Sequence, residues 1–173
     1  IHCILFNHEG LRRGKEFVTR KITTNIARIK YEIDNNKEII PFDLGNIYSK
    51  RDWSDSEDFV IAVWKMLNQE EPNEYVLSSN ETHSVKEFVD LSCKYAGLDV
   101  RWEIDENNPI NTKLYYKDKV ILKINKNYYR PAEVDLLIGD STKTRKKINW
   151  EPKYSFNDLV KRMIENDIKL YNT

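Results

Sequence analysis

The sequence predicts an α/β fold that forms a single unit. Helical and extended patterns alternate along all 173 residues, and neither an internal repeat nor a low-complexity stretch interrupts them. The length also falls within the range of about 100–200 residues that one domain usually occupies.

The first predicted element is a buried strand over residues 1–6, because this apolar run is followed by polar residues. A buried strand needs neighbours on both sides, so we expect the chain to be a piece of a longer protein. A helix is predicted over residues 16–33 and ends at Asn35 and Asn36. Its apolar stripe consists of Val18, Ile22, Ile26, Ile29 and Ile33.

A short strand and a capped helix follow. Residues 38–44 predict the strand, in which Pro41 indicates an edge or a bulge, and a turn comes next at residues 45–46. Ser54 and Glu57 have the spacing of a capping box, in which a hydroxyl and a carboxylate satisfy the first free N–H groups of a helix. We expect this helix to bury Val60, Val63, Trp64 and Leu67.

The second half repeats this alternation with shorter elements. Strands are predicted over residues 75–77 and 100–104, on either side of a helix that a second capping box opens at Ser84 and Gly97 ends. Residues 113–124 predict a hairpin that turns at residues 117–118. A short helix capped at residues 140–141 and a long one opened by Ser155 complete the chain. The long helix is expected to bury Leu159, Val160, Met163, Ile164 and Ile168.

Composition argues against several partners. Lys and Arg together number 28, as do Asp and Glu, so no basic excess favours a nucleic acid or a membrane surface. No apolar run reaches the 18–20 or so residues of a membrane span. Cys3 and Cys93 lack the spacing of a metal site or a disulfide framework, which favours a reduced, cytoplasmic setting without a metal.

Four polar stretches are candidate binding segments, and each has a structural alternative. The loop at residues 7–14 follows the first strand, where α/β sheets place ligands, and its adjacent arginines Arg12 and Arg13 suit a phosphate. It is equally consistent with a solvated loop in which His8 caps the backbone. Lys21 lies near a helix start, where a cation opposes the helix dipole unless an anion is bound. A surface lysine is the simpler interpretation.

Arg51 and Arg130 belong to the other two stretches. Arg51 lies beside an aromatic residue and can clamp a phosphate or form an ion pair with Asp52 or Asp55. Arg130, held before a proline, and Glu133 can bind a phosphate and a sugar hydroxyl, or simply pair with each other. No nucleophile–base arrangement, zinc-protease motif, Walker loop or GxGxxG turn occurs, so the residues alone predict no catalytic centre.

Taken in order, these stretches resemble the GDP-mannose 4,6-dehydratases, a family of extended short-chain dehydrogenase/reductases. The matching segments cover residues 4–9, 12–14, 17–23, 44–46, 51–53, 130–134 and 139–140. The chain departs from the family at Gly10 and Leu11, where a Ser-Pro pair is usual. The resemblance implies a fold made of the last elements of a Rossmann-like NAD(P)-binding domain, interleaved through residues 1–173 with a small α/β substrate-binding lobe. It also implies that the glycine-rich turn and the catalytic Thr, Glu, Tyr and Lys belong to an N-terminal part outside these residues.

The family's binding residues carry over position by position. The resemblance implies that His8 and Arg13 contact NADP. It implies that the nucleotide sugar is bound by Asn7, Val18, Lys21, Phe42, Gly45, Asn46, Arg51, Arg130 and Glu133. Arg51 and Arg130 would meet the diphosphate from two distant loops.

For the complete enzyme, the resemblance implies conversion of GDP-mannose to GDP-4-dehydro-6-deoxy-mannose with bound NADP, as in fucose biosynthesis, by a cytoplasmic homodimer or homotetramer. A hydride leaves C4 of the sugar and returns at C6, and water is lost across C5 and C6. The 173 residues alone are expected to be inactive. Two alternatives stay open: another nucleotide-sugar dehydratase or epimerase, and a non-catalytic nucleotide-sugar-binding module.

Overall fold

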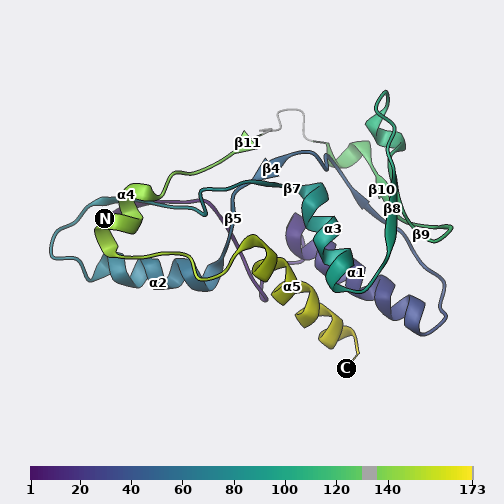
Figure 1. Ribbon diagram of the computed structural model, residues 1–173, viewed down its shortest axis with the longest axis horizontal. Helices are drawn as coiled ribbons and strands as arrows, with labels where there is room; N and C mark the ends of the chain where they lie inside the picture. The colour runs from purple at the N-terminus through teal and green to yellow at the C-terminus, as the bar shows by residue number, and fades with distance from the viewer. Residues whose placement is uncertain (130–135, 173) are drawn as a thin grey trace.

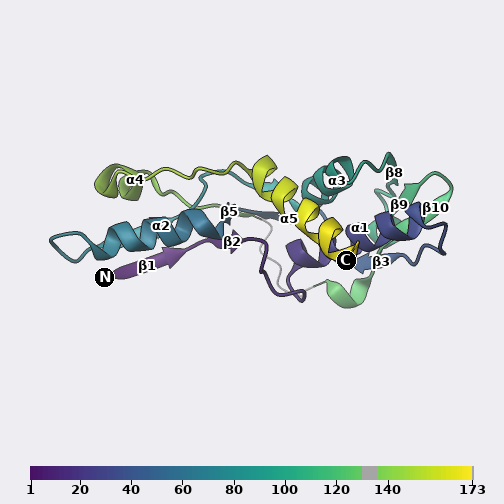
Figure 2. The same cartoon turned by 90° about the horizontal axis from the view of Figure 1, so that it is seen from below.

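The computed structural model describes residues 1–129 and 136–172, and the molecule is elongated (Figures 1 and 2). The helices are α1 (Val18–Asp34), α2 (Ser56–Leu67), α3 (Val85–Tyr95), α4 (Thr142–Ile148) and α5 (Phe156–Tyr171), with short 3-10 turns η1 (Pro109–Asn111) and η2 (Lys126–Tyr128). The strands are β1 (His2–Leu5), β2 (Asn7–Glu9), β3 (Phe42–Leu44), β4 (Lys50–Arg51), β5 (Trp53–Asp55), β6 (Glu74–Leu77), β7 (His83–Ser84), β8 (Val100–Glu103), β9 (Lys113–Tyr116), β10 (Lys119–Ile124) and β11 (Leu136–Leu137). This alternation confirms the predicted α/β class.

Two hydrophobic cores lie at opposite ends of the molecule. In the larger core, α1, α3 and α5 pack against one another and against the sheet β3-β10-β9-β8, with side chains such as Ile22, Phe88 and Met163 fully buried. In the smaller core, α2 packs with β6 and α4 around Phe59 and Trp150. Figure 1 shows α2 and α4 at one end and β8, β9 and β10 at the other.

The chain passes between the two cores several times, and small sheets, two of them parallel and one mixed, join the crossing segments. β1 pairs with β6, and β2 pairs with β5, so that Glu9 lies directly opposite Asp55. A three-stranded sheet in the order β11-β4-β7 places β4 between two neighbours. These crossings bring the loop after β2, the start of α1 and strand β4 to the middle of the molecule.

Several predicted boundaries are confirmed. α1 ends at Asp34 with Asn35 as its C-cap, and Asn36 adopts a positive φ of 52°. Ser84 and Ser155 each form a complete capping box. β3 lies at the edge of its sheet, as the proline before it indicated, and the β9–β10 hairpin turns at Lys117, whose φ is 53°.

The burial predicted for β1 is wrong. All four of its residues are exposed, and Ile4 has 64% of its surface accessible. Among the described residues, β1 pairs with one strand, β6, so its other edge is unpaired. No layer of the described structure buries its side chains.

The predicted face of α2 and its cap are also wrong. Val60, Trp64 and Leu67 are 68%, 65% and 66% exposed, and of the four residues expected to be buried only Val63 packs against the smaller core, where it is half-buried. The buried apolar residues of the helix are Phe59, Ala62 and Met66. The helix is apolar on nearly every side, so its periodicity could not select the buried face. The N-cap is Asp55, which accepts a hydrogen bond from the Glu57 N–H, because β5 continues through Ser54.

None of the described helices is long and apolar enough to cross a membrane. In the part of the chain that the structure describes, no group of three or more His, Cys, Asp or Glu side chains could hold a metal ion.

Candidate functional site

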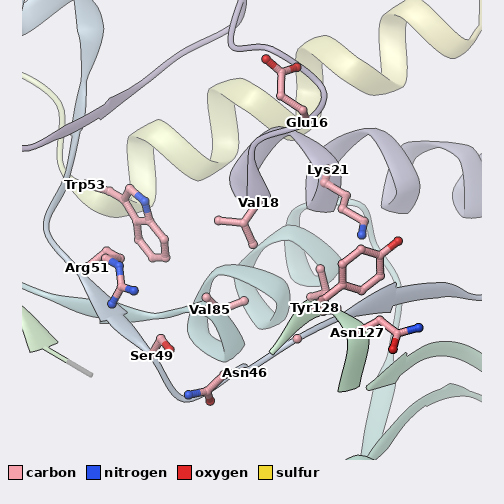
Figure 3. Close-up of a pocket in the computed structure, with 12 residues that line it drawn as sticks. Glu16, Val18, Lys21, Asn46, Ser49, Arg51, Trp53, Val85, Asn127 and Tyr128 are labelled. Atoms are coloured by element: carbon pink, nitrogen blue, oxygen red, sulfur yellow. The ribbon is translucent and has the colours of Figure 1, made fainter. Parts of the chain in front are cut away.

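A pocket of about 370 Å³ lies between the start of α1, strand β4 and the η2 turn (Figure 3). The residues that line it are Glu16, Val18, Lys21, Leu44, Gly45, Asn46, Ser49, Arg51, Trp53, Val85, Asn127 and Tyr128. The structure thus brings together Val18, Lys21, Gly45, Asn46 and Arg51, which the resemblance had assigned to the nucleotide sugar.

The start of α1 makes one wall of this pocket suitable for an anion. Phe17 occupies the N-cap position without a side-chain hydrogen bond to the helix, and the first turn contains no acidic residue. The first N–H groups of such a helix point towards its N-terminus, where the helix dipole is positive. A negatively charged ligand group beside Val18 would be stabilised there.

Two cations add to this preference. Lys21 places its Nζ 3.8 Å from the centre of the Tyr128 ring, an arrangement that holds the ammonium group at the pocket wall. Arg51 lies across the pocket from it (Figure 3). Glu16 is the carboxylate among the lining residues, and it turns away from Lys21 towards Gly14. Among the described residues, Lys21 and Arg51 therefore supply positive charge to the walls of the pocket.

Arg51 lies in the middle strand of the β11-β4-β7 sheet and donates a hydrogen bond from Nη1 to the Lys50 carbonyl at 2.8 Å. The two aspartates that the sequence offered as its partners form other contacts. Asp55 pairs with Arg162 at 2.5 Å. Asp52 is fully buried and accepts hydrogen bonds from Ser79, Asn80 and Gly139.

Gly45 allows the η2 turn to approach closely. A Cβ atom at this position would lie 2.4 Å from the Tyr128 carbonyl oxygen, so any other residue would displace that backbone. Phe42, also assigned to the nucleotide sugar, does not line the pocket. It begins strand β3, is 5% exposed and packs in the larger core.

Asn7, His8 and Arg13 meet in a second hollow of about 380 Å³, which Leu5 and Leu137 help to line. His8 contacts the Phe6 carbonyl through Nδ1 at 2.9 Å. The residues assigned to NADP therefore lie together, and Asn7 lies with them rather than in the first pocket.

The Glu9 carboxylate anchors the loop that contains Arg13 to helix α1. Its carboxylate accepts a hydrogen bond from the Thr19 hydroxyl at 2.6 Å and lies 3.0 Å from Arg13 Nε. Burial raises the pKa of the Glu9 carboxyl, and the Thr19 hydrogen bond and the Arg13 charge oppose that shift. The Arg13 guanidinium lies 3.5 Å from the centre of the Phe17 ring, which links the loop to the start of α1.

Two of the assigned residues cannot be compared with the pocket, and three residues of the pocket were not assigned from the sequence. Arg130 and Glu133 lie outside the described residues. Sequence reasoning missed Ser49, Trp53 and Tyr128 as pocket residues. Ser49 and Trp53 could have been predicted from the alternation of side chains along a strand, because each lies two positions from Arg51 and so faces the same side.

Comparison with known proteins identifies the family of this chain. The family described as GDP-mannose 4,6 dehydratase matches residues 1–163. The chain belongs to this family. It is 45% identical over 170 residues to the GDP-mannose 4,6 dehydratase of Drosophila melanogaster, covering 96% of this chain and 41% of that protein. It is 41% identical over 173 residues to the Homo sapiens enzyme of the same name, covering 100% of this chain and 45% of that protein. The chain thus spans less than half the length of these relatives.

Solved structures with low sequence identity have a similar fold. RMD from Pseudomonas aeruginosa, complexed with NADPH, superposes with a TM-score of 0.73 at 20% identity, over 97% of this chain and 48% of that one. A dTDP-glucose 4,6-dehydratase from Bacillus anthracis, in complex with NAD, gives a TM-score of 0.67 at 15% identity, over 98% of this chain and 44% of that one. The Rossmann-like α/β prediction is confirmed.

Proposed function

We propose that this chain is the nucleotide-sugar-binding part of a GDP-mannose 4,6-dehydratase and that it holds GDP-mannose in the pocket of about 370 Å³. The observation that carries the proposal is the convergence of Lys21, Arg51 and the uncapped start of α1 on one cavity. Three separate sources of positive potential around one small space suit a diphosphate, whose oxygens accept charge-assisted hydrogen bonds. The name of the matching family supports mannose as the sugar and guanosine as the nucleoside.

NADP is the proposed cofactor of the complete enzyme, and His8 and Arg13 are the residues of this chain that would hold it. They fit that role because both line one hollow, where an arginine fork and an imidazole are available to an anionic nucleotide. When bound, the cofactor accepts and returns a hydride. This chain contributes binding and orientation, and it keeps the nucleotide sugar and the cofactor in neighbouring hollows.

We infer from the resemblance that the catalytic Thr, Glu, Tyr and Lys belong to a part of the complete enzyme outside these 173 residues. We therefore expect the purified chain to bind GDP and to show no turnover of GDP-mannose. Measured dehydration by the chain alone would contradict this assignment. The complete enzyme is proposed to act in the cytoplasm, as a homodimer or homotetramer, on the route to fucose.

Calorimetric titration with GDP tests the proposal. Replacing Lys21 or Arg51 with Met removes one charged donor and should weaken GDP binding about 10- to 100-fold, the effect of losing about 1.5–3 kcal/mol. Lys30→Met is the matched control, because Lys30 lies on the same helix as Lys21 but pairs with Asp34. Equal affinity of wild type and both pocket variants would exclude this pocket.

The same titration separates the alternatives. A GDP-mannose enzyme should prefer GDP to dTDP and UDP, whereas preference for either of the latter would indicate another nucleotide-sugar dehydratase or an epimerase. A non-catalytic module would be indicated if the chain, combined with the unmatched part of a relative, restored no activity.

A further inference from the structure

Ser49 is a buried serine whose hydroxyl has no partner. Its residue surface is 4% exposed, and Oγ forms no hydrogen bond within the described part of the chain. Leaving a buried hydroxyl unpaired is unfavourable, so native structures do so rarely and usually for a reason. Ser49 also lines the pocket that contains Arg51.

The backbone fixes the position of this serine. The Ser49 carbonyl accepts a hydrogen bond from Val85 N at 3.2 Å, and the Ile47 carbonyl accepts one from Lys86 N at 2.8 Å. The segment is thereby tied to the start of α3 on both sides of Tyr48. Because this tie holds the main chain, only rotation about χ1 remains to direct the hydroxyl.

The serine faces the same side as Arg51. Side chains two positions apart on an extended segment point in one direction, and the two residues occupy neighbouring places on the pocket wall in Figure 3. A hydroxyl beside a guanidinium can donate to the same oxyanion that the guanidinium binds, and such O–H···O⁻ bonds are short and strong. Asn46, another polar residue of this pocket, accepts a hydrogen bond from Tyr48 N at 2.9 Å.

We propose that Ser49 donates a hydrogen bond to a phosphoryl oxygen of the nucleoside diphosphate, next to the Arg51 guanidinium. This inference rests on the proposed function and adds a binding residue to that site. Rotation about χ1 turns Oγ, which is buried in the unliganded chain, towards the pocket, where the ligand supplies the acceptor that the hydroxyl lacks. Ser49 therefore contributes to affinity for the diphosphate and nothing to the stability of the unliganded fold.

Two alanine variants of the full 173-residue chain separate a binding serine from a structural one. Ser92→Ala is the matched control, because Ser92 is fully buried and its hydroxyl donates to the Phe88 carbonyl at 2.7 Å. Ser49→Ala should keep or raise the melting temperature and weaken GDP binding about tenfold. Ser92→Ala should lower the melting temperature and leave GDP affinity unchanged.

Guanosine, which lacks phosphates, identifies the group that Ser49 contacts. Ser49→Ala should leave guanosine binding unchanged, and an equal loss for GDP and guanosine would overturn the phosphate assignment. Unchanged GDP affinity in Ser49→Ala would overturn the inference while the proposed function stands. Absence of GDP binding by the wild-type chain would overturn the proposed function, and the role of Ser49 with it.

Discussion

Asp52 fixes the strand that carries Arg51, and replacing it with Asn should destabilise the fold strongly. Its Oδ1 accepts hydrogen bonds from Ser79 N and Ser79 Oγ, both at 2.7 Å. Its Oδ2 accepts from Asn80 N and Gly139 N, both at 3.2 Å. The carboxylate therefore ties β4 to the segment before β7 and to the segment after β11, which are the two neighbours of β4 in its sheet.

The magnitude follows from counting donors. An Asn side chain has one acceptor oxygen, so its NH₂ group must face either the Oδ1 pair or the Oδ2 pair of donors. At least one backbone N–H then loses its acceptor. The Ser79 hydroxyl can rotate and accept a hydrogen bond from the NH₂ group, but a backbone N–H can only donate. An orphaned buried donor costs about 1–3 kcal/mol, and the remaining bonds lose the benefit of the negative charge. We expect a total of about 2–4 kcal/mol, a large part of the 5–15 kcal/mol or so that stabilises a typical domain.

Urea unfolding followed by tryptophan fluorescence measures this loss. Asp43→Asn is the control, because the half-buried Asp43 carboxylate accepts from the Asn125 side chain at 2.9 Å and an amide oxygen can replace it there. The control should cost less than about 1 kcal/mol. If Asp52→Asn unfolds within about 0.5 kcal/mol of wild type, the four hydrogen bonds do not carry the stability assigned to them.

Three further predictions test other parts of the structure. Phe59→Ala should lower the free energy of unfolding by about 3–5 kcal/mol and Trp64→Ala by less than about 0.5 kcal/mol, and the reverse order in urea titrations would restore the face of α2 predicted from sequence. Ser84→Ala should cost about 1 kcal/mol through loss of the α3 capping box, whereas Ser56→Ala, beside the true cap of α2, should be nearly neutral in the same assay. Burial raises the folded pKa of Glu9, so its contribution to stability is present below its ordinary pKa and is lost as the pH rises through the raised value. As the pH rises through this acidic range, the unfolding free energy of wild type should therefore fall relative to that of Glu9→Gln. Parallel pH profiles of the two proteins would show that the pKa is not raised.

Much of the fold could be predicted because local patterns determine it. The stripe of α1, the capping boxes at Ser84 and Ser155, and the hairpin turning at Lys117 depend on residues close in sequence. The candidate pocket was predicted less completely. Lys21 and Arg51 were assigned through resemblance to a family, since each had a simpler structural interpretation when taken alone.

Tertiary structure decided what local patterns leave open. Asp55 rather than Ser54 caps α2 because pairing with β2 extends β5 to Asp55, so that the helix begins only at Ser56. The exposure of β1 depends on which layers cover it, and the buried side of α2 depends on where β6 and α4 lie, since that helix is apolar almost all round.

The sequence by itself determined the class of fold, the order of the helices α1 to α5 and the family to which the chain belongs, because short-range hydrogen bonding, side-chain periodicity and ordered motifs are all present along the chain. It did not predict the short strands β2, β4, β5, β7 and β11, which exist only through pairing with distant segments. Only the tertiary structure decided that Lys21, Ser49 and Arg51 share one cavity, and that Asn7 lies with His8 and Arg13 in another. The physical reason is that such sites are formed by strand pairing and helix packing between distant segments, and these contacts have no local signature.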